Sequence, residues 1–281
     1  MPDSPDHFAA YSFVDRIDAL EPGRAAHGTF AVPPNLARFP ACLVAEAVGQ
    51  LAAWASMDHI DYRGRPVAGL ATETRFMGDA HPGATIELSV TVDQCDDEAV
   101  AYSGEAHSGG RRLLALVDCL GPMLPVAEFD DPDALRARFA LLRAEGAPPA
   151  RFPGLPLLPV DVHERVPGAS VRARLDVPRE ARFFNDHFPR RPVFPATLLL
   201  DTQIGLALDV AQGAEWAGGS PVAPDRMTHV KMRSFIAPGQ ALDLAIDVKP
   251  PVDGIARAML QASTDGRTVA SARLELQVRH D

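Results

Sequence analysis

The sequence predicts an α+β fold of two similar halves, each a curved antiparallel sheet wrapped around one long buried helix. Three observations lead to this prediction. Two long segments are almost wholly apolar and lack internal proline, other segments alternate apolar and polar residues after Pro-Gly turns, and both features recur about 145–156 residues apart. A chain of 281 residues is also long enough for two domains.

The first shared feature is a Pro-Gly pair followed by a Val-Pro pair. Pro22-Gly23 and Val32-Pro33 align with Pro167-Gly168 and Val177-Pro178 at an offset of 145. The apolar segments come next, FPACLVAEAVGQLAAW from Phe39 and FPATLLLDTQIGLALD from Phe194, at an offset of 155. At sixteen residues each they are too long for strands, so we expect buried helices.

Strands follow the helix in each half. PGATIELSVTV from Pro82 aligns without gaps to PGQALDLAIDV from Pro238, and the same offset of 156 superimposes Gly110-Arg111 on Gly266-Arg267. The alternation after each Pro-Gly turn predicts a strand with one buried face. Two such copies in one chain would pack as an internal pseudo-dimer.

A proline-rich segment separates the two copies. AEGAPPARFPGLPLLP, residues 144–159, contains five prolines, and proline neither continues a helix nor donates to a central sheet. Just before it, residues 131–146 predict a short helix, capped by Asp131 or Asp133 and ended by Gly146. We therefore expect an N-terminal domain at 1–145, a linker at 146–159 and a C-terminal domain at 160–281.

Composition excludes several classes of function. Hydrophobic residues make up 47% and charged residues 23%, as in ordinary globular proteins, and a net charge of −10 disfavours nucleic acid as a partner. We found no apolar run long enough for a membrane span and no secretory signal in MPDSPDHFAA, so the cytoplasm is expected. Three cysteines, far apart, predict neither a disulfide framework nor a zinc site.

The loop before the second helix is the main difference between the halves. It contains ten more residues than its counterpart, within REARFFNDHFPRRPV. Residues 185–195 combine Asn, Asp and His with several prolines, which hold the backbone rigid. The helix after them is expected to begin near Ala196, where free backbone N–H groups can stabilise a developing oxyanion.

This loop resembles the active-site motif of the 3-hydroxyacyl-(acyl-carrier-protein) dehydratases. The family motif is roughly H-F-P-G-x-P-x-x-P-G, with Glu or Asp fourteen residues after the histidine. Here residues 187–196 are HFPRRPVFPA and Asp201 is the acid. Arg190 and Ala196 replace two of the family's glycines. The resemblance implies the hotdog fold, here as a tandem double hotdog.

In that family, the histidine and the acid of one site come from opposite hotdogs. His187 has no counterpart in the first half, but Glu46 aligns with Asp201, and Glu46-Ala47-Val48-Gly49-Gln50 resembles the family's E-A-x-x-Q. Gly205 replaces the glutamine in the second half. The resemblance therefore implies one composite site of His187 and Glu46, supported by Gln50, and a second, dead site around Asp201.

The implied reaction removes water from a 3-hydroxyacyl thioester to give a trans-2-enoyl thioester, in fatty-acid or polyketide-type synthesis. His187 would take the α-proton and a protonated Glu46 would donate to the leaving hydroxyl. The backbone N–H of Ala196, after Pro195, would hold the thioester carbonyl oxygen. No metal or organic cofactor is implied.

The substrate implied is a thioester of acyl carrier protein or of CoA, with its acyl chain in the apolar interior between the two helices. Arg182, Arg190 and Arg191 are candidates for a carrier-docking patch. The chain is also expected to form a homodimer of double hotdogs or to associate with synthase subunits.

Two other functions stay open. One is a catalytically weak hotdog that binds acyl chains or serves as a scaffold in a synthase. The other is a hotdog thioesterase, which would need a carboxylate-activated water rather than the His187 loop. The sequence contains no G-x-S-x-G elbow, Walker loop or G-x-G-x-x-G cradle.

Overall fold

The two apolar segments form the two long helices of the protein. In the computed structural model, which describes residues 7–279, α1 spans Ala41–His59 and α3 spans Ala196–Gln212. Each begins directly after a proline, Pro40 or Pro195, whose extended backbone conformation ends the preceding loop. Most of both helices is buried, as expected for helices that are apolar on most faces.

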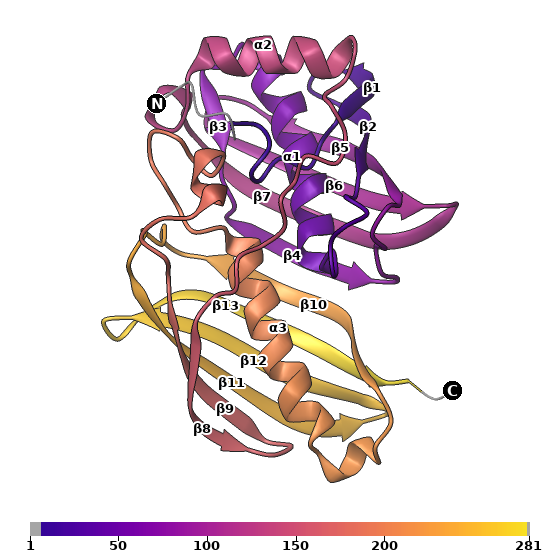
Figure 1. Cartoon of the computed structure of the whole chain (residues 1–281), viewed down its shortest axis with the longest axis vertical. Helices are drawn as coiled ribbons and strands as arrows, with labels where there is room; N and C mark the ends of the chain where they lie inside the picture. Colours follow the sequence, from indigo (N-terminus) through magenta and orange to yellow (C-terminus); the bar gives the residue numbers. More distant parts are fainter. Residues whose placement is uncertain (1–6, 280–281) are drawn as a thin grey trace.

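The strands belong to one antiparallel sheet, and together with α1 and α3 they form an α+β double hotdog (Figure 1). The first half contains β1 (Arg16–Glu21), β2 (Ala25–Ala31), β3 (Gly64–Pro66), β4 (Leu70–Phe76), β5 (Thr85–Cys95), β6 (Ala99–Ser108) and β7 (Arg111–Pro125). The second contains β8 (Val160–Val166), β9 (Ser170–Asp176), β10 (Val222–Met232), β11 (Ala241–Val252), β12 (Ile255–Thr264) and β13 (Arg267–Val278).

The repeat read from the sequence is confirmed strand by strand. β2 and β9 begin at residues 25 and 170, the helices at 41 and 196, and β6 and β12 at 99 and 255. These are the three offsets found in the sequence. The Gly-Arg pairs at the start of β7 and β13 lie at the tips of equivalent hairpins.

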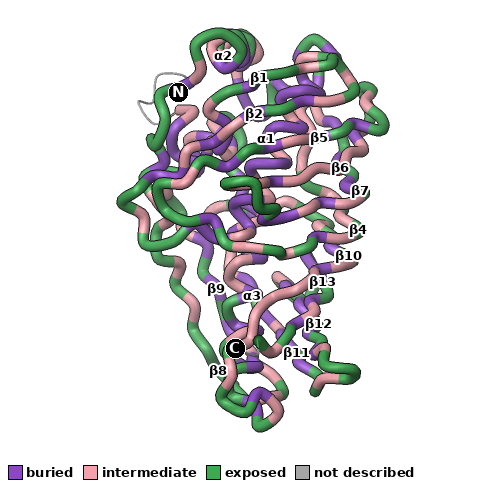
Figure 2. The backbone as a smooth tube through the Cα atoms, turned by 90° about the vertical axis from the view of Figure 1, so that its right-hand side faces the viewer, coloured by how far each residue is buried: buried purple, intermediate pink, exposed green. Residues whose placement is uncertain are grey.

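The two curved sheets expected from the sequence are joined edge to edge. The strand order is β1-β2-β5-β6-β7-β4-β10-β13-β12-β11-β9-β8, with β3 paired to β7 off this path. β4 pairs antiparallel with β10, so that Thr74 lies opposite Met227. Figure 2 shows the strands from β1 to β11 following one another in this order through both halves, with buried and exposed residues alternating along them.

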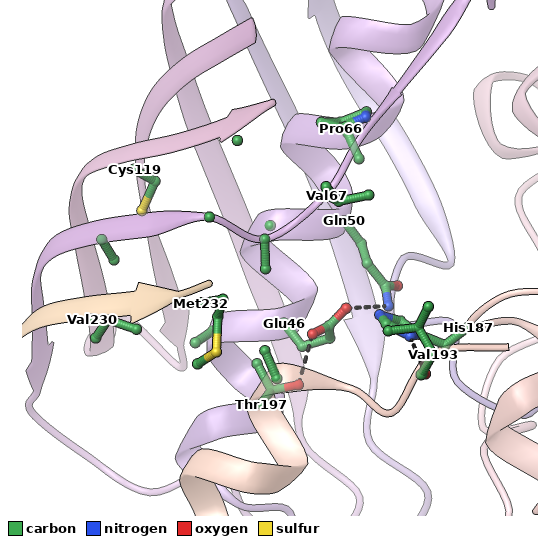
Figure 3. Close-up of a pocket in the computed structure, with 18 of the residues that line it drawn as sticks. Glu46, Gln50, Pro66, Val67, Cys119, His187, Val193, Thr197, Val230 and Met232 are labelled. Atoms are coloured by element: carbon green, nitrogen blue, oxygen red, sulfur yellow. Dashed lines mark hydrogen bonds between the residues drawn. The ribbon is translucent and has the colours of Figure 1, made fainter. Parts of the chain in front are cut away.

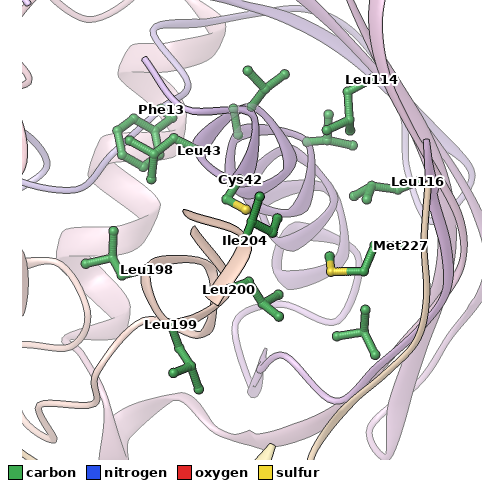
Figure 4. Close-up of a cluster of buried hydrophobic side chains, with 14 of the residues drawn as sticks. Phe13, Cys42, Leu43, Leu114, Leu116, Leu198, Leu199, Leu200, Ile204 and Met227 are labelled. Atoms are coloured by element: carbon green, nitrogen blue, oxygen red, sulfur yellow. The ribbon is translucent and has the colours of Figure 1, made fainter. Parts of the chain in front are cut away.

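The helices also meet across the two halves. α1 and α3 contact each other, and their apolar side chains share one buried cluster with the inner face of the sheet (Figure 4). Leu43 of α1 and Leu199 of α3 are completely buried in it. The halves therefore share a single hydrophobic core as well as a sheet.

The short helix before the linker forms, but it ends earlier than expected. α2 spans Pro132–Arg143, and the Asp131 side chain caps it by accepting from the Asp133 N–H at 3.4 Å. The prediction that Gly146 ends the helix is wrong by three residues, because Gly146 lies in the following turn, with a positive φ of 81°. Three 3₁₀ turns complete the secondary structure, η1 (Val126–Glu128), η2 (Arg182–Asn185) and η3 (Glu215–Ala217).

The proline-rich segment contains neither helix nor strand between residues 146 and 159 of the described chain. It runs from the end of α2 past α1 and α3 and reaches β8 at Val160 (Figure 1). Phe152 on this segment is buried against Phe13 and Phe39. The bounds 1–145 and 160–281 stay a prediction for the two domains.

Asp15, just before β1, gives the fold a testable pH dependence. Its carboxylate accepts the Ala31 N–H at 2.8 Å, but burial raises the pKa of Asp15 to about 6 despite this bond and the Arg138 charge. A raised pKa in the folded state means that the neutral form is favoured. The stability it contributes is complete below the ordinary pKa of 3.8 and is lost as pH rises through 6.

We predict that Asp15→Asn raises the free energy of unfolding at pH 8, on the order of 1 kcal/mol after allowance for solvent screening. The gain should shrink toward pH 4, where the aspartate is itself neutral. Urea unfolding at pH 4, 6 and 8 measures it, with the exposed Asp18→Asn as control. A destabilised Asp15→Asn at pH 8 would contradict the prediction.

Candidate active site

His187 lies in the loop between η2 and α3, and its ring is held by the loop itself. Its Nδ1 is 2.8 Å from the carbonyl oxygen of Val193. Because a carbonyl only accepts, Nδ1 carries a proton, and the neutral ring keeps the lone pair on Nε2. Burial lowers the pKa of His187, against the opposing charge of Glu46. The ring is therefore suited to be a neutral base at physiological pH.

A buried cation reinforces this state of the ring. The Arg65 guanidinium of β3 lies 4.3 Å from the centre of the Phe188 ring and 3.5 Å from the Asp130 carboxylate. Its side chain is only 16% exposed. The positive charge of Arg65 also lowers the pKa of His187, as expected for like charges brought close together.

Glu46 and Gln50 are one helical turn apart on α1, and the amide of Gln50 orients the carboxyl group. Gln50 Oε1 accepts the Phe13 N–H at 2.8 Å. Gln50 Nε2 donates to the Tyr11 carbonyl at 2.9 Å and to Glu46 Oε1 at 3.1 Å. Gln50 therefore lies beside Glu46, as expected of a supporting residue, and both its amide oxygen and its amide nitrogen are hydrogen-bonded.

The second oxygen of Glu46 reaches across to the other half. Thr197 Oγ1, in the first turn of α3, donates to Glu46 Oε2 at 2.7 Å, and the Tyr11 hydroxyl lies 2.8 Å from Thr197 Oγ1. Neither Thr197 nor Tyr11 was predicted from the sequence. The sequence did contain a sign of Thr197, because the repeat aligns this hydroxyl with Cys42 of α1, so the two halves differ at this position. It contained no such sign of Tyr11, because Tyr11 precedes the first repeated feature.

Asp186, next to His187, ties the N-terminal segment to the same loop. Its carboxylate accepts the N–H of Phe8 at 2.5 Å, the N–H of Tyr11 at 2.6 Å and the Ser12 hydroxyl at 3.0 Å. Asp186 is only 7% exposed, and burial raises its pKa while the three donors oppose that shift. This buried carboxylate thus determines where Tyr11 sits beside the His187 ring, whose centre is 5.8 Å from that of Tyr11.

His187 and Glu46 line the same cavity, of about 240 Å³. Figure 3 shows them with Gln50 at one end of it, away from Cys119 and Val230. The cavity lies against α3 at Thr197 but also extends along α1, over its small residues Ala45, Gly49 and Ala53, toward β6 and β7. The apolar interior is therefore bounded by one helix and the sheet for much of its length, and not by the two helices alone as expected.

The small residues of α1 explain why this half contains the cavity. At the offset of 155, α3 carries Leu200, Ile204 and Leu208 in place of these three small residues. Leu200 and Ile204 are buried, and Leu208 is partly buried against the same hydrophobic cluster. Large apolar side chains thus fill the second half where the first half is hollow.

The N-terminus of α3 lies beside the cavity, as expected. Ala196 lines it, and Pro195 precedes the helix without capping it by a side chain among the described residues. The Pro195 carbonyl accepts from the N–H groups of Leu198 and Leu199 at 3.1 and 3.3 Å. Ala196 and Thr197, whose N–H groups come before these two in the first turn, both line the cavity that contains His187 and Glu46.

Asp201 belongs to a different hollow. It forms an ion pair with Arg38 at 2.7 Å, and Gly205 next to it leaves the space that Gln50 fills in the first half. This second hollow is lined by the proline-rich segment and α3 and contains no histidine among the described residues. Asp201 is thus separated from the His187 cavity.

The arginines of the loop contact the first half. Arg191 pairs with Glu128 at 2.8 Å, and Arg190 donates to the Ala127 carbonyl at 3.1 Å. Both side chains remain about half exposed. They hold the His187 loop against the turn after β7 and still present positive charge to solvent.

Other kinds of site find no support within residues 7–279. Their His, Cys, Asp and Glu side chains do not gather into a group that could hold a metal ion. None of their helices combines the length and the apolar character needed to cross a membrane.

The second half of the chain matches a known protein family. Residues 163–273 match the ApeI-like family model, described as ApeI dehydratase. A 3-hydroxyacyl-[acyl-carrier-protein] dehydratase FabZ of Oenococcus oeni is 34% identical over 122 residues, covering 42% of this chain and 86% of the relative. Through its C-terminal hotdog, the chain belongs to the FabZ-like dehydratase family. A Burkholderia thailandensis FabZ is 29% identical over 135 residues, with 44% of this chain and 80% of that protein covered.

Solved structures resemble the whole FabZ-like chain in fold. The dehydratase domain of PpsC from Mycobacterium tuberculosis superimposes with a TM-score of 0.56 at 16% identity, covering 96% of this chain and all of that one. A tesB protein of Mycobacterium avium subspecies paratuberculosis gives a TM-score of 0.59 at 14% identity, with 94% and 96% covered. Both dehydratases and thioesterases share this architecture, so the fold leaves the reaction open.

We predict that Asp186→Ala lowers the free energy of unfolding by about 2–4 kcal/mol, because it leaves the buried N–H groups of Phe8 and Tyr11 without an acceptor. Urea unfolding measures the loss. The matched control is Asp209→Ala, whose carboxylate is 62% exposed in its pair with Arg165 and should matter by no more than about 0.5 kcal/mol. Equal stability of the two variants would refute the anchoring role of Asp186.

Proposed function

We propose that this protein dehydrates 3-hydroxyacyl thioesters to trans-2-enoyl thioesters. The observation that carries the proposal is one cavity lined by a carboxyl group from one half and by a histidine from the other, whose bond from Nδ1 to the Val193 carbonyl leaves the lone pair of the neutral ring on Nε2. A base and an acid on one cavity are what the elimination of water requires. The family membership of the C-terminal hotdog supports the same reaction.

In the proposed reaction, His187 Nε2 takes the proton from C2 of the substrate. The electron pair of the C–H bond forms the C2–C3 double bond as the C3–O bond breaks. Glu46, in its protonated form, gives its proton to the departing hydroxyl, which leaves as water. The N–H groups at the start of α3, from Ala196, stabilise the negative charge that builds on the thioester carbonyl oxygen.

After each turnover, His187 carries an extra proton and Glu46 lacks one. Return of a proton from the imidazolium to the carboxylate, directly or through water, restores both groups. His187 and Glu46 act on the same cavity, so this exchange needs no other residue. The cycle therefore needs no redox cofactor.

The substrate is proposed to be an acyl chain on a carrier protein or on CoA. The apolar part of the cavity along α1 suits the acyl chain, and the half-exposed Arg190 and Arg191 are candidates to meet an acidic carrier. Fatty-acid or polyketide-type synthesis is the proposed setting. Assembly into a larger homodimer or with synthase subunits stays part of the proposal.

The two alternatives find less support. A scaffold that only binds acyl chains would not need Glu46, Gln50 and His187 directed to one cavity. A thioesterase would rely on a carboxylate-activated water rather than on the His187 loop, whereas here the His187 ring lines the same cavity as Glu46.

We predict that the purified protein converts a short 3-hydroxyacyl thioester to the conjugated enoyl thioester, followed by ultraviolet absorbance. His187→Ala and Glu46→Gln should lower kcat by about a hundredfold or more, because each removes a proton-transfer group. Asp201→Asn is the matched acid control and should retain activity, because Asp201 lies outside the cavity.

Three other results would each redirect the proposal. Loss of activity with Asp201→Asn but not with Glu46→Gln would mean that the acid was assigned to the wrong half. Release of free thiol instead of enoyl product would indicate a thioesterase. No reaction on CoA or carrier substrates would favour the acyl-binding scaffold.

We predict that Ala53→Leu shortens the acyl chains accepted. The added side chain would fill the cavity along α1, as Leu208 does at the equivalent position of α3. The ratio kcat/KM for long chains should fall by about tenfold, while the shortest substrates keep theirs. Ala53→Ser, of nearly unchanged volume, is the control. A uniform loss at every chain length would show that Ala53 does not limit the cavity.

A further inference from the structure

A chain of hydroxyl groups connects the N-terminal segment to Glu46. The Tyr11 hydroxyl lies 2.8 Å from Thr197 Oγ1, which lies 2.7 Å from Glu46 Oε2. We propose that Thr197, held by Tyr11, is a positioning residue that directs the acidic proton of Glu46 into the cavity. This inference rests on the proposed function, in which Glu46 is the acid.

The first step is the orientation of the Gln50 amide. The Phe13 N–H can only donate and the Tyr11 carbonyl can only accept, so the amide oxygen must face Phe13 and the amide nitrogen must face Tyr11. The remaining hydrogen of this nitrogen points to Glu46 Oε1. Oε1 thus accepts from Gln50, and its lone pair that faces Gln50 cannot carry the acidic proton.

The second step is the direction of the hydroxyl chain. Tyr11 is 1% exposed, and burial raises the pKa of Tyr11, so its phenol keeps its proton. Among the described residues, Thr197 is the one group to which this phenol is hydrogen-bonded. If Thr197 donated to Tyr11, the phenol proton would be buried without an acceptor, which is unfavourable. Tyr11 therefore donates to Thr197, and the single Thr197 proton goes to Glu46 Oε2.

The consequence is a fixed direction for the acidic proton. Thr197 occupies one lone pair of Oε2, so a proton on that oxygen cannot point to Thr197 and points into the cavity instead. Once the proton has been transferred, the carboxylate keeps two donors, one from Gln50 and one from Thr197. The same pair of donors thus orients the acid before the step and stabilises its conjugate base afterward.

The equivalent pair of positions, Cys42 and Asp201, differs from Thr197 and Glu46 in a way that supports this assignment. At the repeat offset of 155, Cys42 replaces Thr197 and Asp201 replaces Glu46. Burial, reinforced by the charge of Asp201, raises the pKa of the Cys42 thiol. A thiol is a weaker hydrogen-bond donor than a hydroxyl. Asp201 therefore has no hydroxyl donor equivalent to Thr197, and its donor is the Arg38 guanidinium instead.

The kinetic test compares four variants with the wild type. Thr197→Val and Tyr11→Phe should lower kcat by about tenfold or more with KM nearly unchanged, because the donor acts on the proton-transfer step. Thr197→Ser should restore most of kcat. Thr202→Val is the matched control, since its hydroxyl is on the same helix but donates to the Leu198 carbonyl. A wild-type kcat in Thr197→Val, a change confined to KM, or an equal loss in Thr202→Val would overturn the proposal.

A measurement without turnover separates this inference from the proposed reaction. The infrared carboxyl bands of Glu46 are identified by their loss in Glu46→Gln. They should shift in Thr197→Val, shift less in Tyr11→Phe and return in Thr197→Ser. Bands that are the same in wild type and Thr197→Val would overturn the positioning role even in an active enzyme. A wild type that forms no enoyl product but shows these shifts would refute the proposed reaction alone.

Discussion

The interaction on which the site depends is the hydrogen bonding of Glu46, a carboxyl group set in the middle of an apolar helix. Such a group is costly to bury unless both oxygens are bonded. α1 itself supplies Gln50 for one oxygen, and the other is bonded by Thr197 from the opposite half. The two hotdogs must therefore be packed together before the carboxyl group is satisfied, and the requirement that stabilises Glu46 also assembles the composite site.

Carrying both halves in one chain has allowed each to specialise. α1 keeps Gln50 and the small residues that leave a cavity, whereas α3 has Gly205 and three large apolar residues at the equivalent positions. In a homodimer, any such change would appear in both copies and alter two sites at once. Here the second hollow has Gly205 in place of the amide and contains the Arg38–Asp201 ion pair, while the first keeps Gln50 beside Glu46.

Much of this architecture could be predicted because short stretches of sequence determine it. The helices at Ala41 and Ala196 and the equivalent strands follow from apolar period and from turn residues. The pairing of β4 with β10 could not be predicted, because neither strand has a sequence pattern that identifies its partner in the other half. Asp186 was noticed only as part of a polar loop, since its partners lie more than 170 residues away.

The N-terminal segment shows why some functional residues cannot be found from sequence patterns. Its contacts with Asp186 and Gln50 are made chiefly by its backbone, through the N–H groups of Phe8, Tyr11 and Phe13 and the Tyr11 carbonyl. Backbone groups are the same for nearly every residue, so these bonds constrain the sequence little. The Tyr11 hydroxyl is the exception, because a phenylalanine would make the same backbone bonds and fill the same space. What distinguishes tyrosine there is the proton it donates toward Thr197, and hence toward the acid.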